Sequence, residues 1–203
     1  MRQTGTRDHL ITTGLKLLHR QGFHASGVQD IIQAAGVPKG TFYTHFESKE
    51  QFGAEVLGRF WERRAARTTA LLGDETRPPL ARLKAWFDGK VTEREDRTLH
   101  SGCMIGNFAA ELAVDSRLVR DRLAAIFAAW TTLLATTIRE AVAADQIVIA
   151  LPADTIAAFL VDAFEGSVLR SKVDRDPTAL IRLREIVFTT ILVEKSPAPE
   201  FSA

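Results

Sequence analysis

The sequence predicts an all-α fold of about nine helices, with a small N-terminal domain of three helices followed by a larger helical domain. Three observations lead to this prediction. Apolar residues recur at helical spacing along most of the 203 residues, as expected when each helix buries one face. No alternating apolar and polar run is long enough to predict a strand. Glycine and proline interrupt the pattern at short intervals, which is typical of turns between helices.

The composition is that of a soluble globular protein, with 46% hydrophobic and 25% charged residues. The single cysteine, Cys103, excludes an intramolecular disulfide and a multi-cysteine metal site, so no metal or other cofactor is expected. The polar start of the chain lacks the apolar core of a signal peptide. The longest uncharged run, residues 123–138, is shorter than the roughly 18 residues that a membrane helix requires. We therefore expect a cytoplasmic protein without a membrane partner.

The first three expected helices are short and closely spaced. The first runs from about residue 7 to residue 20 and ends at Gly22, the second lies between Gly27 and Gly36, and the third begins at Pro38. The apolar face of the first helix follows the i, i+4, i+7, i+8 pattern. It consists of Leu10, Gly14, Leu17 and Leu18.

A longer fourth helix is expected from Ser48 to about Leu72, and it ends at the clearest boundary in the chain. That boundary is formed by Gly73-Asp74 and by Arg77-Pro78-Pro79. We therefore assign residues 1–48 to the N-terminal domain, residues 48–72 to a connecting helix, and residues 73–203 to the second domain. The connecting helix is expected to be the only rigid link between the two.

The second domain is expected to contain five more helices, over residues 80–94, 103–112, 116–144, 153–173 and 177–193. Residues 145–152 are expected to form a connection. Its Ile147-Val148-Ile149 run is strand-like, but nothing nearby in the sequence would pair with it. The proline-containing tail, residues 196–199, is expected to be frayed.

The segment from Val28 to Phe46 has the residues that a helix-turn-helix needs. Ala35 is small where two helices would touch, and Gly36 tolerates the positive φ of a tight turn. Phe42 and Phe46 lie four residues apart, so they would face inward together. The outward face of this third helix then carries donors and hydroxyls of the kind that read bases in the major groove of DNA. Those residues are Lys39, Thr41, Tyr43 and His45.

Three segments within residues 6–57 resemble the N-terminal signature of TetR-type repressors: residues 23–32, 35–46 and 48–50. The resemblance implies a DNA-binding domain whose third helix enters the major groove. Many relatives have Ser or Thr where this chain has Gly27, so Ser26 is expected to supply the missing hydroxyl. Tyr43 could instead mainly pack, and Lys49 could simply be solvated. The contacts implied on DNA are Ser26, Lys39, Gly40, Thr41, Tyr43, Thr44, His45 and, as a phosphate ligand, Lys49.

The distribution of charge agrees with this implication. Residues 1–67 hold ten Lys and Arg against six Asp and Glu, whereas the remainder holds sixteen against nineteen. Four of the five histidines also lie in the first part. A basic N-terminal third on a mildly acidic body is expected where one end of a protein faces phosphates.

Residues 102–112 and 165–170 resemble the C-terminal domains of one TetR subgroup, which includes regulators of N-ethylmaleimide reductase and of acrylate metabolism. The last two helices carry more apolar residues than one core face needs. In the family such helices pair with those of a second copy, which implies a homodimer. A wholly intramolecular core is the alternative. The interface expected on this basis comprises Phe159, Phe164, Leu183, Ile186 and Val187.

Cys103 is a candidate sensor because its thiol would lie at a helix N-terminus, where the helix dipole favours thiolate. Arg97 and His100 are close enough in sequence to assist. The alternative is an inert buried cysteine. A ligand pocket is expected to be lined by aromatic and apolar side chains, each of which could equally belong to the core. They are Trp86, Met104, Phe108, Phe127, Trp130 and Phe164.

The predicted function is sequence-specific regulation of transcription. The expected partners are a double-stranded DNA operator, a small-molecule effector and a second copy of the chain. The preferred hypothesis is a repressor released from a palindromic operator by a small apolar or electrophilic ligand. An activator is the alternative. A helical adaptor without DNA binding would leave the third helix unexplained, and a thiol enzyme using Cys103 and His100 would lack a third orienting group.

Overall fold

The N-terminal domain is built from three helices packed on the start of a fourth. They are α1 (Arg2–Gln21), α2 (Val28–Ala35), α3 (Lys39–His45) and α4 (Lys49–Leu72). The computed structural model describes residues 2–93 and 101–195. Gly36 ends α2 with φ of 64°, the left-handed conformation predicted for the turn. Phe42 and Phe46 are buried, as predicted, and their rings lie 5.2 and 4.9 Å from that of Phe52.

The close approach of α1 to α4 depends on Gly14. A Cβ atom at this position would lie 2.2 Å from Cζ of Phe52, so the two helices could not come so close with any larger residue. Phe52 is itself completely buried. The first helix begins at Arg2, about five residues earlier than predicted.

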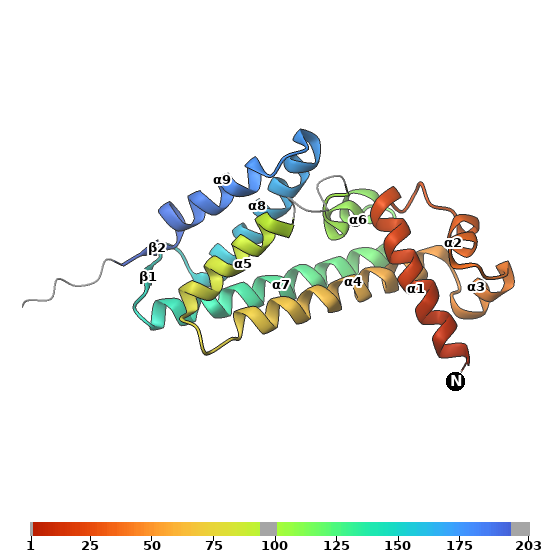
Figure 1. Ribbon diagram of the computed structural model, residues 1–203, viewed down its shortest axis with the longest axis horizontal. Coiled ribbons are helices and arrows are strands. Elements are labelled where there is room, and N and C mark those ends of the chain that lie inside the picture. Colours follow the sequence, from red (N-terminus) through yellow and green to blue (C-terminus); the bar gives the residue numbers. More distant parts are fainter. Residues whose placement is uncertain (1, 94–100, 196–203) are drawn as a thin grey trace, which may run out of the picture.

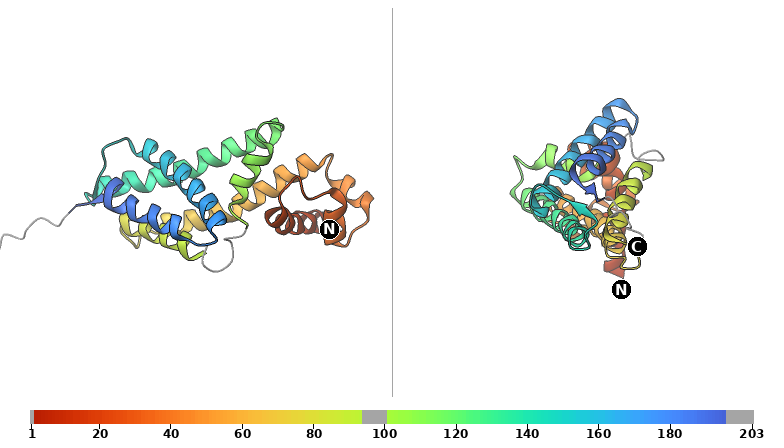
Figure 2. Two further views of the ribbon diagram at one scale, coloured as in Figure 1. Left: turned by 90° about the horizontal axis from the view of Figure 1, so that it is seen from above. Right: turned by 90° about the vertical axis from the view of Figure 1, so that its left-hand side faces the viewer.

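The body consists of five further helices around one core. They are α5 (Pro79–Glu93), α6 (Met104–Leu112), α7 (Arg117–Ala143), α8 (Ala153–Asp174) and α9 (Thr178–Ile186), the last followed by a π-helical turn (Val187–Ile191). Figure 1 shows α4 and α7 side by side along the length of the molecule. Views in Figure 1 and Figure 2 agree that α1–α3 form one end of an elongated molecule. With nine α-helices in the described ranges, the predicted all-α class is confirmed.

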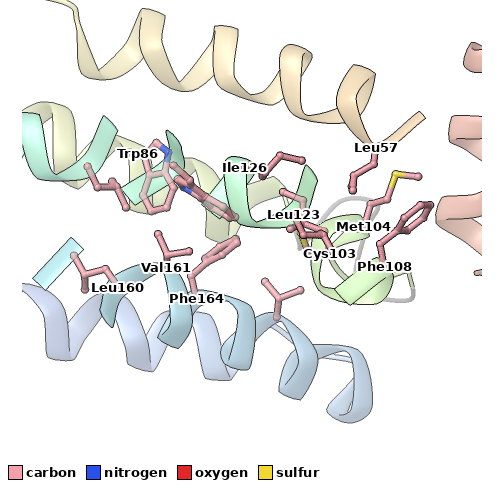
Figure 3. Packing of buried hydrophobic residues seen from close by; sticks show 14 of the residues in the cluster. Leu57, Trp86, Cys103, Met104, Phe108, Leu123, Ile126, Leu160, Val161 and Phe164 are labelled. Carbon is pink, nitrogen blue, oxygen red and sulfur yellow. The ribbon is translucent and has the colours of Figure 1, made fainter. Parts of the chain in front are cut away.

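Three large rings form the centre of this core. Trp86 of α5, Trp130 of α7 and Phe164 of α8 are each at most 2% exposed, and their ring centres are 5.4–6.3 Å apart. Figure 3 shows Trp86 and Phe164 pointing toward one another between the helices. Their contact joins α5, α7 and α8 into one unit.

The expectation that Ile147-Val148-Ile149 is unpaired was wrong. Strand β1 (Ile147–Val148) pairs antiparallel with β2 (Val193–Glu194), with Val148 opposite Val193. The partner strand follows α9 near the C-terminus, so a search of the neighbouring sequence could not find it. The predicted fraying of residues 196–199 lies outside the described residues.

In the described part of the chain, we find no helix that combines the length and the apolarity required to cross a membrane.

Candidate nucleic-acid interface and ligand cavity

Helix α3 lies at one end of the molecule (Figure 1), and its exposed residues are mainly polar. Its buried residue is Phe42, and the side chains on the opposite side reach solvent. Tyr43 is 52% exposed, although its ring also contacts that of Phe42 at 5.3 Å. The hydroxyl of Thr44 donates to the carbonyl oxygen of Gly40 at 2.9 Å. Of the residues expected on this face, Lys39, Gly40, Tyr43 and Thr44 are exposed, and Thr41 and His45 are half-buried.

Ser26 does not extend this surface, which corrects the expected contact. Its side chain is fully buried, and its hydroxyl donates to the carbonyl oxygen of Gly22 at 2.8 Å. The N-terminus of α2 is capped instead by a carboxylate, because Oδ2 of Asp30 accepts from the N–H of Gly27 at 2.7 Å. The hydroxyl of Ser26 therefore holds the turn between α1 and α2.

Lys49 is the first residue of α4, and its side chain reaches the turn between α1 and α2. The helix start is capped by Ser48, whose Oγ accepts from the N–H of Gln51 at 3.0 Å. The ammonium of Lys49 lies 4.2 Å from the ring centre of Phe23. Partial burial lowers the pKa of Lys49, while the nearby carboxylates Glu111 and Asp30 act in the opposite direction. The side chain is thus held at this position rather than freely solvated.

Helix α6 contacts the N-terminal domain directly. The expectation that α4 is the only rigid link between the two domains was therefore wrong. The side chain of Glu111 accepts from the N–H of His24 at 2.8 Å, and the ring of His24 hydrogen bonds to the carbonyl oxygen of Glu111 at 3.0 Å. At the other end of α6, the ring of His19 hydrogen bonds to the carbonyl oxygen of Gly102 at 3.1 Å. A change in the position of α6 would therefore reach α1 and the turn after it.

The structure does not support a thiolate at Cys103. The residue caps the start of α6 but is only 3% exposed. Burial, followed by the charge of Glu165, raises the pKa of the thiol to about 12. The desolvation cost of a buried charge outweighs the favourable helix dipole here. The expected assistance from Arg97 and His100 falls outside the described residues.

A cavity of about 260 Å³ lies between α6 and α8, beside Cys103. It is largely apolar, with a carboxylate, an ammonium and an amide at its wall. Its lining residues are Gly102, Cys103, Gly106, Asn107, Ala110, Glu165, Gly166, Val168, Leu169 and Lys172. Lys172 Nζ lies 3.4 Å from Oδ1 of Asn107. A Cβ at Gly106 would lie 2.4 Å from Oε2 of Glu165, so the carboxylate of Glu165 occupies the space beside this glycine.

Cys103 is the one residue of the expected pocket that borders this cavity. The others pack in the core and do not border this cavity. Figure 3 shows Met104 and Phe108 packed among the side chains of neighbouring helices. The buried members are Trp86, Met104, Phe108, Trp130 and Phe164, and Phe127 is half-buried. Glu165 and Lys172 were missed, although their seven-residue separation places them on one face of α8.

Three of the five residues expected at the dimer interface are buried within the chain itself, which corrects that expectation. Phe164 and Val187 are completely buried and Leu183 is 7% exposed, so these three residues belong to the core of the chain itself. Phe159 and Ile186 are 52% and 45% exposed. Other large exposed apolar residues of α8 and α9 are Leu169, Val173 and Ile181.

Two family models match the chain. The model described as bacterial regulatory proteins of the tetR family matches residues 10–56, which include α2 and α3. The model described as the tetracyclin repressor-like C-terminal domain matches residues 79–187. Together they cover most of the sequence.

Individual relatives support the same family assignment as these two models. The transcriptional repressor DhaR of Mycobacterium sp. strain GP1 is 36% identical over 192 residues, covering 95% of each chain. The regulator AcuR of Cereibacter sphaeroides is 29% identical, covering 84% of this chain and 78% of AcuR. The crystal structure of reduced NemR from Escherichia coli superposes with a TM-score of 0.87 at 26% identity, covering 96% of this chain and 99% of NemR. This chain therefore belongs to the TetR family of bacterial transcriptional regulators, and it is a helix-turn-helix DNA-binding protein.

Proposed function

We propose that the protein is a homodimeric repressor that binds a palindromic operator through α3 and is released by a small molecule bound between α6 and α8. The observation that carries the proposal is the exposed polar face of α3 beside the capped start of α4. The relatives named as repressors, DhaR and NemR, support repression over activation.

On the operator, α3 would lie in the major groove. Lys39, Thr41, Tyr43 and His45 have donors or hydroxyls that suit base edges and nearby phosphates. Lys49 would bind a phosphate as a point charge. Gly40, with no heavy atom within 4 Å of a Cβ built on it, leaves room for the DNA backbone to approach.

A second copy of the chain would bind the exposed apolar face of α8. Phe159, Leu169 and Val173 follow one another at ten and four residues, which places them on one side of a helix. Several exposed large apolar side chains on one helix face are typical of protein interfaces. A two-fold dimer would present two copies of α3 to half-sites about 34–36 Å apart.

The effector would bind in the α6–α8 cavity. Its apolar wall with Glu165, Lys172 and Asn107 suits a small, mostly apolar molecule with one polar group. Because α6 borders this cavity and also holds His24 through Glu111, a ligand that moves α6 would move the DNA-binding domain. A 10- to 100-fold loss of operator affinity requires only about 1.4–2.8 kcal/mol of differential ligand binding.

Binding titrations test the DNA-binding part of the proposal. The DNA flanking the gene should be bound far more tightly than scrambled DNA of the same length. Thr41→Ala and Tyr43→Ala should change which operator variants are preferred, because each removes a group that faces bases. Equal affinity for operator and scrambled DNA would exclude sequence-specific recognition. A reporter that rises when the gene is deleted indicates a repressor, whereas a reporter that falls indicates an activator.

The role of the thiol is tested with a reactive enone and its saturated ketone. Because the pKa of Cys103 is raised, we expect non-covalent release, so that both compounds act alike on the wild type and on Cys103→Ser. Release by the enone alone, lost in Cys103→Ser, would instead establish a covalent thiol switch.

A further inference from the structure

A second, basic cavity of about 200 Å³ lies where α1, α4 and α5 meet. Leu15 comes from α1 in the DNA-binding domain, and Lys90 and Glu93 come from α5 in the body. The remaining lining residues lie on α4: Phe60, Arg63, Arg64 and Arg67. None of these residues belongs to the polar face of α3 or to the α6–α8 cavity.

The lining of this basic cavity carries four cationic side chains and one carboxylate. Glu93 accepts hydrogen bonds from Nη1 of Arg64 at 3.2 and 3.0 Å and lies 3.8 Å from Nζ of Lys90. Within residues 2–93 and 101–195, no carboxylate lies within ion-pair distance of Arg63 or Arg67. Among the described residues that line the cavity, one carboxylate thus faces four cationic side chains.

Arg64 supplies a second, independent sign of an incomplete site. Its side chain is 12% exposed, and its Nε is buried without a hydrogen-bond partner in the described structure. A buried donor left unsatisfied costs about 1–3 kcal/mol. An anion in the basic cavity could accept from this guanidinium and recover part of that cost.

The rest of the wall is apolar. Leu15 and Phe60 are partly buried against the core, and the guanidinium of Arg64 lies 5.4 Å from the ring centre of Phe60. Such a site has cations on one side and a ring and an aliphatic side chain on the other. It suits a molecule that carries both a negative charge and an apolar group.

We propose that the basic cavity binds a small organic anion, a carboxylate joined to a short hydrocarbon or aromatic group. The carboxylate lies against Arg63, Arg64 and Arg67, where planar guanidinium groups can form paired hydrogen bonds. The hydrocarbon part lies against Leu15 and Phe60. The basic cavity shares no lining residue with the α6–α8 cavity, so the two sites are separate. A ligand in it would touch both α1 of the DNA-binding domain and α5 of the body.

Isothermal titration of the full-length protein with benzoate tests the proposal, with benzyl alcohol and inorganic phosphate as probes that each lack one half of the ligand. Benzoate should bind about tenfold or more tightly than either, because only it can use both sides of the site. Arg63→Gln/Arg67→Gln should weaken benzoate about tenfold or more, since charge-assisted hydrogen bonds are lost. Both arginines are exposed on the surface of α4, so the double variant should fold.

Two control variants locate the binding. Arg117→Gln removes an arginine on α7 whose side chain is 86% exposed, and Lys172→Gln removes the ammonium of the α6–α8 cavity. Neither change should alter benzoate affinity. The proposal is overturned if benzoate binds no more tightly than benzyl alcohol, or if Lys172→Gln rather than the double arginine variant abolishes binding.

Discussion

The sulfur of Cys103 and the hydroxyl of Ser26 are both placed by sequence where they could react or bind, and both are buried. Cys103 occupies the N-cap position of α6 without a side-chain cap hydrogen bond, whereas the hydroxyl of Ser26 closes the turn between α1 and α2. Burial changes their chemistry, because a thiol in apolar surroundings keeps its proton and a hydroxyl inside a turn donates to the backbone. At the scale of single residues, accessibility decides which groups remain available for function.

The raised pKa of Cys103 predicts a specific loss of stability in alkaline solution. In the unfolded chain the thiol ionises above its ordinary pKa of 9.0, whereas in the folded protein it stays protonated to about 12. The contribution of the protonated thiol to the free energy of unfolding is therefore fully present below pH 9. It decreases as the pH rises above 9, by up to about 1.4 kcal/mol per pH unit. Urea unfolding should show the free-energy difference between wild type and Cys103→Ala falling by about 1 kcal/mol from about pH 9 to pH 10.

The matching control is the same pair of proteins between about pH 7 and pH 8, where that difference should stay constant because neither state ionises. A difference that remains constant up to about pH 10 would mean that the thiol titrates normally in the folded protein.

Lys49 is expected to contribute affinity without specificity. Lys49→Met removes the ammonium that lies over the ring of Phe23 but keeps an unbranched side chain of similar length, so folding should be preserved. Operator and non-operator DNA should both be bound more weakly, and the slope of log affinity against log salt should decrease by about one, as expected for one lost phosphate contact. Affinity measurements at several salt concentrations check this. An unchanged slope would remove Lys49 from the interface.

At the scale of elements, a glycine decides how closely α1 and α4 approach one another. Gly14 lets α1 lie against Phe52 of α4. Gly89, by contrast, lies on the exposed side of α5 with no heavy atom within 4 Å of a built Cβ. Two glycines within helices can therefore respond in opposite ways to the same substitution.

Gly14→Ala should destabilise the protein, and Gly89→Ala should stabilise it. At Gly14 the new methyl group would overlap the ring of Phe52, which Phe42 and Phe46 prevent from moving. Overpacking costs about 1–3 kcal/mol and exceeds the gain of about 0.5–1 kcal/mol from helix propensity. At Gly89 only that gain remains. Chemical unfolding measures both free energies, and a stable Gly14→Ala protein would show that α1 can shift away from α4.

At the scale of the whole molecule, an elongated subunit has its DNA-facing end at α1–α3 and its exposed apolar residues on α8 and α9. Phe159, Leu169, Val173, Ile181 and Ile186 are each 45–73% exposed. Covering this apolar surface would be energetically favourable. Pairing through α8 and α9 would leave both α3 helices free to reach DNA.

Phe159→Glu/Ile186→Glu should therefore yield monomers with weakened operator binding. Two carboxylates buried in an apolar interface would be desolvated without partners. Light scattering gives the molar mass, and a DNA titration gives the affinity. Val114→Glu is a matched control, because Val114 is 88% exposed outside α8 and α9. A full dimer in the double variant would place the interface elsewhere.

The sequence alone determined the helices, the turn at Gly36 and the inward direction of Phe42 and Phe46. These follow from local periodicity and from the backbone freedom of glycine, which a short stretch of chain contains in full. It also indicated the family, because the residues of the helix-turn-helix are contiguous.

Only the tertiary structure decided which apolar residues of the body fill the core and which remain on the surface. Phe159 and Phe164 have the same side chain on the same helix, yet one is exposed and the other is buried against Trp86 and Trp130. The strand pair at Val148 and Val193 and the contact of α6 with His24 also required distant segments to meet. Such contacts depend on how whole helices pack, and residue type and spacing do not contain that information.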